Sequence, residues 1–98
     1  MIIHLEKFGS LLTSREGGRE AVAAFAPTMR AVAADETIEV EFEGVGSLSP
    51  SWADEFLTRL HDDFGDRLVL SSSENLSVRA TIDMLETVHG YKYRWASK

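Results

Sequence analysis

Hydroxyl and carboxylate side chains cluster just after a glycine-rich turn. The hydroxyls belong to Ser47, Ser49 and Ser51, and the carboxylates to Asp54 and Glu55. Neighbouring carboxylates could act as general acid and base, and a serine at a helix start could carry a phosphate. Adjacent helix residues, however, point about 100° apart and do not share a site. We therefore interpret Asp54 and Glu55 as first-turn acids that complement the helix dipole.

Other catalytic or ligand-binding patterns are absent from the sequence. His4, His61 and His89 lie far apart and lack the spacing of histidine metal sites. No serine occupies a Gly-x-Ser-x-Gly elbow. The turn Gly44-Val45-Gly46 lacks the third glycine of a dinucleotide fingerprint and the lysine of a phosphate-binding loop. The sequence therefore predicts no catalytic residue, no metal ligand and no cofactor, and we expect that the protein is not an enzyme.

Length, composition and charge narrow the classes of partner. The chain has 98 residues and no cysteine, which predicts a single domain in the reducing cytoplasm. Residues 1–90 hold all 16 acidic residues against seven basic ones, a net charge of −9, whereas residues 91–98 carry +3. The acidic body repels phosphate groups. We therefore expect no binding to nucleic acid and none to membranes.

The N-terminal part of the chain predicts a strand followed by a helix. Apolar residues at 2–8 indicate the strand. Thr13 and Glu16 have the spacing of a capping box for the helix that follows. The glycines at 17–18 weaken its first turn, each by about 1 kcal/mol relative to alanine. Pro27 lies inside the helical stripe, so we expect a kink or two short helices there.

The remaining elements predict a small α/β domain over residues 1–90. In the strand at 37–42, three apolar residues alternate with glutamates, which favours helices on one sheet face and a more open opposite face. An amphipathic helix then ends at Gly65, a short buried strand occupies 67–70, and a third helix runs from about 75 to 89. This order predicts a mixed sheet of about four strands with helices mainly on one face.

The segment from Val40 to Leu57 resembles the central motif of the STAS-like domains of unknown function (DUF4325). That motif runs hydrophobic-Asp-Phe-x-Gly-Val and, a few residues later, Ser-x-Ser-Phe-Ala-Asp-Glu. This chain has Val-Glu-Phe-Glu-Gly-Val at 40–45 and Ser-Pro-Ser-Trp-Ala-Asp-Glu at 49–55. The flanking segments also resemble the family, so the resemblance extends roughly from Phe8 to Leu85.

The resemblance implies a binding module with the fold of the sulfate-transporter and anti-sigma-factor-antagonist domains. Such domains often partner a serine kinase of the histidine-kinase-like ATPase superfamily. In true antagonists a serine within Asp-Ser-Ser/Thr-Gly is phosphorylated, and that motif falls on residues 49–52 here. Ser51 is therefore the candidate phosphoacceptor, although Ser49 replaces the aspartate and Trp52 replaces the glycine.

Two structural interpretations compete with phosphorylation at this helix start. Ser49 could cap the helix with Pro50 at its first position, or Ser51 could be the cap. A phosphate on Ser51 would also add a charge of about −1.5 to −2 beside Asp54 and Glu55. The phosphate and these two carboxylates would therefore repel each other unless a basic partner binds. We expect that Ser51 more often stays unmodified.

The tail at 91–98 alternates aromatic and basic residues. Tyr91, Tyr93 and Trp95 either form an exposed arm or fold back on the domain as a short edge strand, and we favour the edge strand. The +3 charge of the tail beside the acidic body also makes a homodimer an alternative.

The sequence supports two functional hypotheses. The first is a non-catalytic regulatory module that docks onto a protein, for example a histidine-kinase-like ATPase, through the start of its second helix. Its contact residues would be Ser47, Ser49, Ser51, Trp52, Asp54 and Glu55. The alternative is a small-molecule or nucleotide sensor that binds at the loop Gly44–Ser51.

Overall fold

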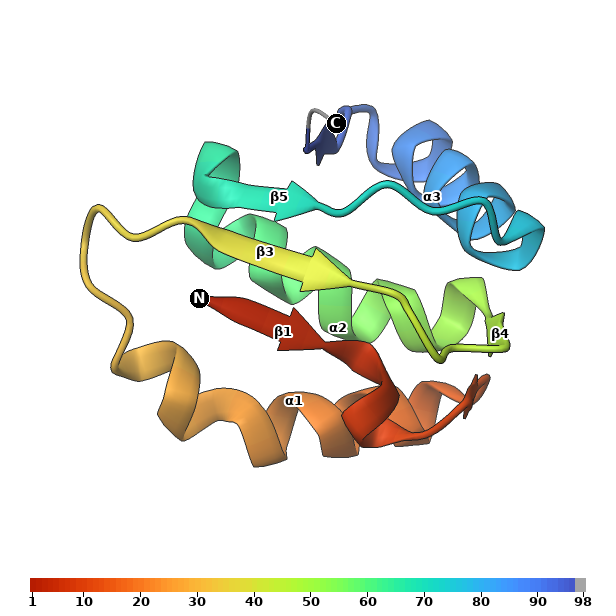
Figure 1. The fold of residues 1–98 in the computed structure, drawn as a ribbon, viewed down its shortest axis with the longest axis horizontal. Helices are drawn as coiled ribbons and strands as arrows, with labels where there is room; N and C mark the ends of the chain where they lie inside the picture. The colour runs from red at the N-terminus through yellow and green to blue at the C-terminus, as the bar shows by residue number, and fades with distance from the viewer. Residues whose placement is uncertain (97–98) are drawn as a thin grey trace.

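The computed structural model describes residues 1–96 and contains a central sheet of four parallel strands (Figure 1). In the strand order β1-β3-β5-β6, they are β1 (Ile2–His4), β3 (Ile38–Glu41), β5 (Leu68–Leu70) and β6 (Arg94–Trp95). The predicted α/β fold with about four strands is confirmed. The sheet is parallel throughout rather than mixed, because each connection between successive strands contains a crossover helix that returns the chain to the same end.

The three helices cover one face of this sheet. They are α1 (Arg15–Arg30), α2 (Pro50–Phe64) and α3 (Leu76–His89). Strands are added in one direction along the chain, and nearly all such crossovers are right-handed, so each helix falls on the same side. In Figure 1, α2 crosses behind the strands. The prediction of helices mainly on one face is confirmed.

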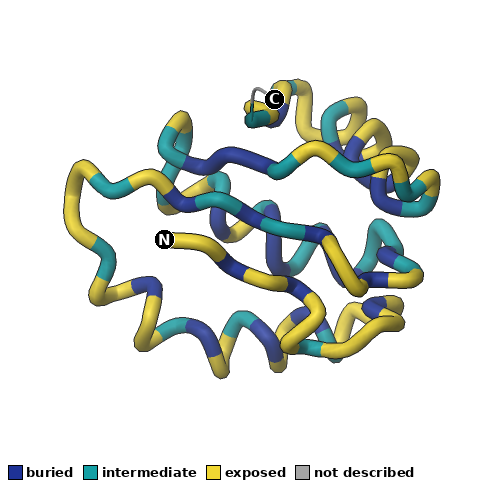
Figure 2. The backbone as a smooth tube through the Cα atoms, viewed as in Figure 1, coloured by how far each residue is buried: buried dark blue, intermediate teal, exposed yellow. Residues whose placement is uncertain are grey.

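The opposite face of the sheet is less buried along β3. Ile38 and Val40 are fully buried, whereas Glu39 and Glu41 are half-buried, and Figure 2 shows this alternation along β3. The strand register places Glu39 beside Ile2 on one side and Val69 on the other. The alternation that predicted a one-sided sheet therefore reflects the real burial of β3.

A second, two-stranded parallel sheet was not predicted from the sequence. It pairs β2 (Leu11–Leu12) with β4 (Ser47–Leu48), and it continues into a hydrogen bond from Ser49 N to Leu12 O of 2.9 Å. Two-residue strands are too short for a period to be recognised in a sequence. This small sheet joins the chain before α1 to the chain before α2, so the two helix starts lie side by side.

The start and the middle of α1 differ from the predictions. Ser14, not Thr13, caps the helix, because its hydroxyl accepts a hydrogen bond of 2.9 Å from Gly17 N. The helix also continues through Pro27 as one element instead of two short ones. Pro27 lies in the last turn, between Phe25 and Met29, whose burial in the core holds that turn in place.

Gly18 contributes close packing, although the sequence indicated only a weakened helix turn. A Cβ atom at this position would lie 2.7 Å from the carbonyl oxygen of Trp52 and 2.9 Å from the Cβ atom of Glu55. A side chain therefore has no room, and the backbones of α1 and α2 approach each other directly. Glycine has a low helix propensity, and the close packing of α1 against α2 offsets this cost at Gly18.

The C-terminal tail forms the edge strand that the sequence favoured. Arg94 pairs with Val69, and Trp95 pairs with Leu70 at the edge of the sheet. Tyr93 is buried in the core, and Tyr91 packs against it. Ser97 and Lys98, the end of the predicted tail, lie outside the described residues. Within residues 1–96, none of the helices has the length and hydrophobicity needed to cross a bilayer.

We expect Gly18→Ala to destabilise the protein. At an exposed helix position this substitution stabilises by about 1 kcal/mol, but here the added methyl group clashes with backbone, and overpacking costs about 1–3 kcal/mol. Thermal denaturation should give a lower Tm than wild type. Ala24→Gly, at an exposed position of α1, is the propensity control and should cost about 1 kcal/mol. A Tm of Gly18→Ala above wild type would contradict the close helix contact.

Candidate functional site

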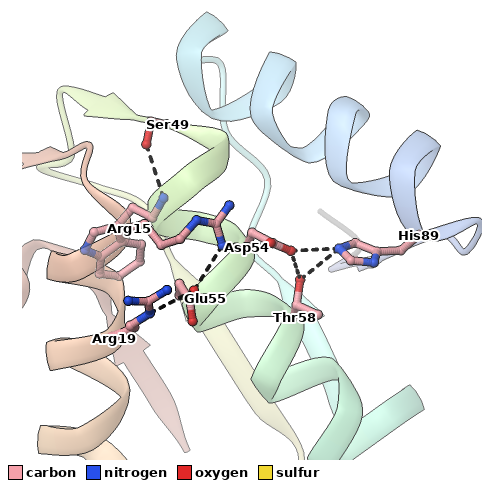
Figure 3. Close-up of polar contacts among 8 residues, drawn as sticks. Arg15, Arg19, Ser49, Asp54, Glu55, Thr58 and His89 are labelled. Carbon is pink, nitrogen blue, oxygen red and sulfur yellow. Dashed lines mark hydrogen bonds and ion pairs between the residues drawn. The ribbon is translucent and has the colours of Figure 1, made fainter.

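The start of α2 is a capped helix terminus held by hydrogen bonds. The Ser49 hydroxyl accepts a hydrogen bond of 3.2 Å from Trp52 N (Figure 3). It also donates one of 2.7 Å to the carbonyl oxygen of Thr13. Pro50 occupies the first helical position, where its missing N–H costs nothing. Of the two caps that the sequence left open, the structure selects Ser49. Ser51 lies within the first turn.

The six predicted contact residues do not share one surface. Ser47, Ser49, Ser51, Asp54 and Glu55 are all half-buried. Trp52 is only 2% exposed, so the structure removes it from the predicted contact surface. Its position four residues before Phe56 on the apolar stripe already indicated burial.

Trp52 instead anchors the helix start to the core. Its indole stacks on the ring of Phe56 with centroids 5.1 Å apart, and it contacts Phe8 at 5.9 Å. Aromatic pairs of this kind add about 0.5–1.5 kcal/mol beyond the area they bury. The bulky residue at the position of the family's glycine therefore has a packing role.

Two arginines of α1 neutralise the carboxylates of α2. Arg15 Nη1 lies 3.1 Å from Asp54 Oδ2 and 3.0 Å from Glu55 Oε1, and Arg19 Nε lies 3.3 Å from the same glutamate oxygen (Figure 3). The expectation that Asp54 and Glu55 do not share a site is wrong, because one guanidinium spans both. They also lie beyond the first turn of α2, so they do not act as first-turn acids.

Asp54 also contacts His89, at the end of α3. His89 Nε2 lies 2.7 Å from Asp54 Oδ1, and the Thr58 hydroxyl donates a hydrogen bond of 3.0 Å to the same oxygen (Figure 3). A catalytic relay needs the two ring nitrogens of a histidine to face different partners. Here Nε2 faces both Asp54 and Thr58, which is 3.4 Å away. This geometry connects α1, α2 and α3 through a single carboxylate, that of Asp54.

These contacts set the charge state of Asp54. Burial alone would raise the pKa of the Asp54 carboxyl, but the hydrogen bonds from His89, Arg15 and Thr58 outweigh it. The net result is a pKa below the usual value for an aspartate. Asp54 is therefore a poor proton donor or acceptor near neutral pH and a stable centre for the three-helix cluster.

An aromatic stack that sequence reasoning missed continues from this cluster. The Tyr91 ring lies parallel to the His61 ring at 3.7 Å and beside the His89 ring at 5.6 Å. Tyr93 meets the same stack edge-on, and its burial raises the pKa of its hydroxyl far above the usual value. The alternating aromatics of the tail were the available signal, but the sequence did not indicate that they meet two distant histidines.

No metal centre is formed by the part of the chain that the structure describes. Residues 1–96 contain no group of three or more histidine, aspartate or glutamate side chains that could hold an ion. His61 and His89 are separated by the Tyr91 ring, and His4 lies on the exposed side of β1.

The loop Gly44–Ser51, the predicted sensor site, uses its polar backbone groups internally. The amides of Gly46 and Ser47 both donate to the carbonyl oxygen of Ser10, at 2.8 and 3.1 Å. The side chain of Asn75 donates to the carbonyl oxygens of Val45 and Gly46. These donors and acceptors hold the loop to its neighbours, so they are not free to cradle a ligand.

Comparison with known proteins identifies one family. The sequence model of the family of STAS-like domains of unknown function (DUF4325) matches residues 28–77, about half of the chain. The matched segment contains β3, β4, α2 and β5, and so includes the capped helix start. No curated protein and no solved structure matches the chain.

We expect Asp54→Asn to lower stability in a pH-dependent way. The pKa of Asp54 in the folded protein lies below the usual value of about 3.9, so the ionised carboxylate stabilises the fold above that pH. This contribution is lost as pH falls through the lowered pKa. Calorimetry should find a higher Tm for wild type than for Asp54→Asn at pH of about 5 and above, and convergence in more acidic buffer.

The exposed Asp62 supplies the matched control for this comparison. Within the described residues the Asp62 side chain forms no hydrogen bond or ion pair, so Asp62→Asn should leave the Tm close to that of wild type. A Tm gap for Asp54→Asn that stays constant into acid would show that the carboxylate is not the source of the stabilisation.

Proposed function

The chain belongs to the family of STAS-like domains of unknown function, and on that premise we propose that it is a non-catalytic regulatory module. It docks onto a partner protein through the start of α2. The observation that carries the proposal is the rigidity of this helix start, which Ser49 caps from outside and Trp52 anchors from inside. A rigid surface loses little conformational entropy on binding, which favours recognition.

The contact surface of the proposed module consists of the half-buried residues around that start, namely Ser47, Ser49, Ser51, Asp54 and Glu55. The cluster around Asp54 supports a binding role, since its hydrogen bonds and ion pairs join α2 to α1 and α3 and hold this surface in one conformation. The chain outside this cluster is strongly acidic, so a partner with a basic face would associate faster. We propose a histidine-kinase-like ATPase as that partner, because the STAS resemblance implies this class.

We expect Ser51→Arg to abolish the complex with such an ATPase. The partner to test is the purified ATPase encoded nearest to this protein, with complex formation followed by size-exclusion chromatography and calorimetry. A long charged side chain in the first turn of α2 would block close approach, and a loss of at least tenfold in affinity is expected. Thr28→Arg, at an exposed position near the end of α1, is the matched control and should bind as wild type does.

The result that would contradict docking at this surface is a folded Ser51→Arg protein with unchanged affinity. Circular dichroism of both arginine variants shows whether weaker binding comes from a changed contact surface or from unfolding.

The arginines of α1 bear on the proposed phosphoacceptor. In the sequence, the negative charges of Asp54 and Glu55 opposed a phosphate on Ser51. In the fold, Arg15 and Arg19 balance both carboxylates, so the local repulsion is smaller than the sequence suggested. Ser51 therefore stays the candidate phosphoacceptor that the family resemblance implies, beside the interpretation that it is unmodified.

If the cognate kinase modifies this helix start, we expect one phosphate, at Ser51 and not at Ser49. The Ser49 hydroxyl donates to Thr13 O and accepts from Trp52 N, and transfer of a phosphoryl group to its oxygen would break this helix cap. Peptide mass spectrometry locates the phosphate, and Ser51→Ala should abolish it. Modification of Ser49 in the wild-type protein would contradict this assignment.

A further inference from the structure

A cavity of about 520 Å³ lies at the carboxyl end of β5, away from the start of α2. It is bounded by the loop after β5, the first turns of α3 and the edge strand β6. Its lining residues are Ser72, Ser73, Glu74, Arg79, Asp83 and Trp95. This volume falls within the range of about 300–1,000 Å³ that is typical of small-molecule sites. None of these residues belongs to the proposed docking surface.

The walls of this cavity come from well-held elements. Asn75 caps α3 by accepting hydrogen bonds from Ser77 N and Val78 N, and its amide group also holds the loop before β4. On α3, Arg79 and Asp83 are four residues apart and therefore lie on the same face.

Trp95 forms a wall of the cavity from the sheet edge. It pairs with Leu70 of β5, and its ring lies 6.4 Å from the ring of Phe42. The fold thus places an indole from β6 beside two charged side chains of α3.

The lining chemistry selects a particular kind of ligand. Trp95 is 38% exposed and lines the cavity, so its ring is available for stacking. Arg79 presents planar hydrogen-bond donors, while Asp83 and Glu74 present carboxylate acceptors. Within the described residues, the Arg79 guanidinium forms no ion pair.

The charge of the lining argues against polyanions. One arginine and two carboxylates give a net charge of −1, and the surrounding body of the chain is acidic as well. A nucleoside triphosphate would be repelled by this negative charge. An uncharged ring could instead place its hydrogen-bond acceptors toward Arg79 and its donors toward the carboxylates.

We propose that this cavity binds an uncharged planar heterocycle of the purine base or nucleoside class. The ring stacks on Trp95, its N–H groups donate to Asp83 or Glu74, and its ring nitrogens or carbonyl oxygen accept from Arg79. This site is separate from the docking surface, so its occupation can be tested without any partner protein.

The test is a titration of the full chain with adenosine and with inosine, followed by calorimetry and tryptophan fluorescence. Wild-type protein should bind at least one of them saturably, with a change in the emission of Trp95. Arg79→Ala and Asp83→Asn alter exposed side chains, and each should weaken binding about tenfold, as expected for the loss of a charge-assisted hydrogen bond. Arg59→Ala, on the exposed face of α2, is the matched control and should bind as wild type does.

Three outcomes would overturn the proposal. The first is no saturable binding of either nucleoside up to its solubility limit. The second is binding that both α3 variants leave unchanged, which would place the ligand elsewhere. The third is tighter binding of ATP than of adenosine, because the charge argument requires the opposite order. Trp95→Phe, which keeps an aromatic ring at the sheet edge, should retain weakened binding while the fold is preserved.

Discussion

The direct backbone contact between α1 and α2 at Gly18 is the constraint on which the rest of the structure depends. Any side chain at that position would meet the carbonyl oxygen of Trp52, so the two helices could not approach as they do. Their approach brings Arg15 and Arg19 within reach of Asp54 and Glu55, and it seals the Trp52 indole over Phe8 and Phe56. A residue without a side chain thus fixes both the apolar anchor and the charged cluster of the helix start.

The strand order explains why this domain has one covered and one open sheet face. Each crossover adds a strand on the same side of the last one, so the helices gather on one face and the order of strands never reverses. Doubly wound sheets bind ligands where the strand order reverses, and that crevice is absent from the described sheet. The loop Gly44–Ser51 is hydrogen-bonded to Ser10 and Asn75, and a cavity of about 520 Å³ lies beside the edge strand.

The polar cluster around Asp54 illustrates how tertiary contacts change the meaning of a motif. In the sequence, Asp54 and Glu55 are two unpaired charges at a helix start. In the fold, residues from α1 and α3 surround them, and the Tyr91 stack extends the connection to the C-terminal segment. The helix start proposed for docking is therefore in contact with each of the other two helices.

The sequence by itself determined most of the local elements of this protein, although the strand predicted at 2–8 ends at His4 and a 3₁₀ helix covers Leu5–Phe8. The alternation of β3 predicted a strand, the amphipathic stripe of α2 predicted a helix, and the glycines at 65 and 90 mark helix ends. These signals can be recognised because they depend only on neighbours in the chain. The motif at 40–57 also gave the family. Tertiary structure decided the rest, namely the choice of Ser49 as cap, the burial of Trp52, the pairing of β2 with β4 and the contact of Arg15 with residues 39 and 40 positions away. Such contacts leave no period or local pattern, because they form only when distant segments pack around a shared core.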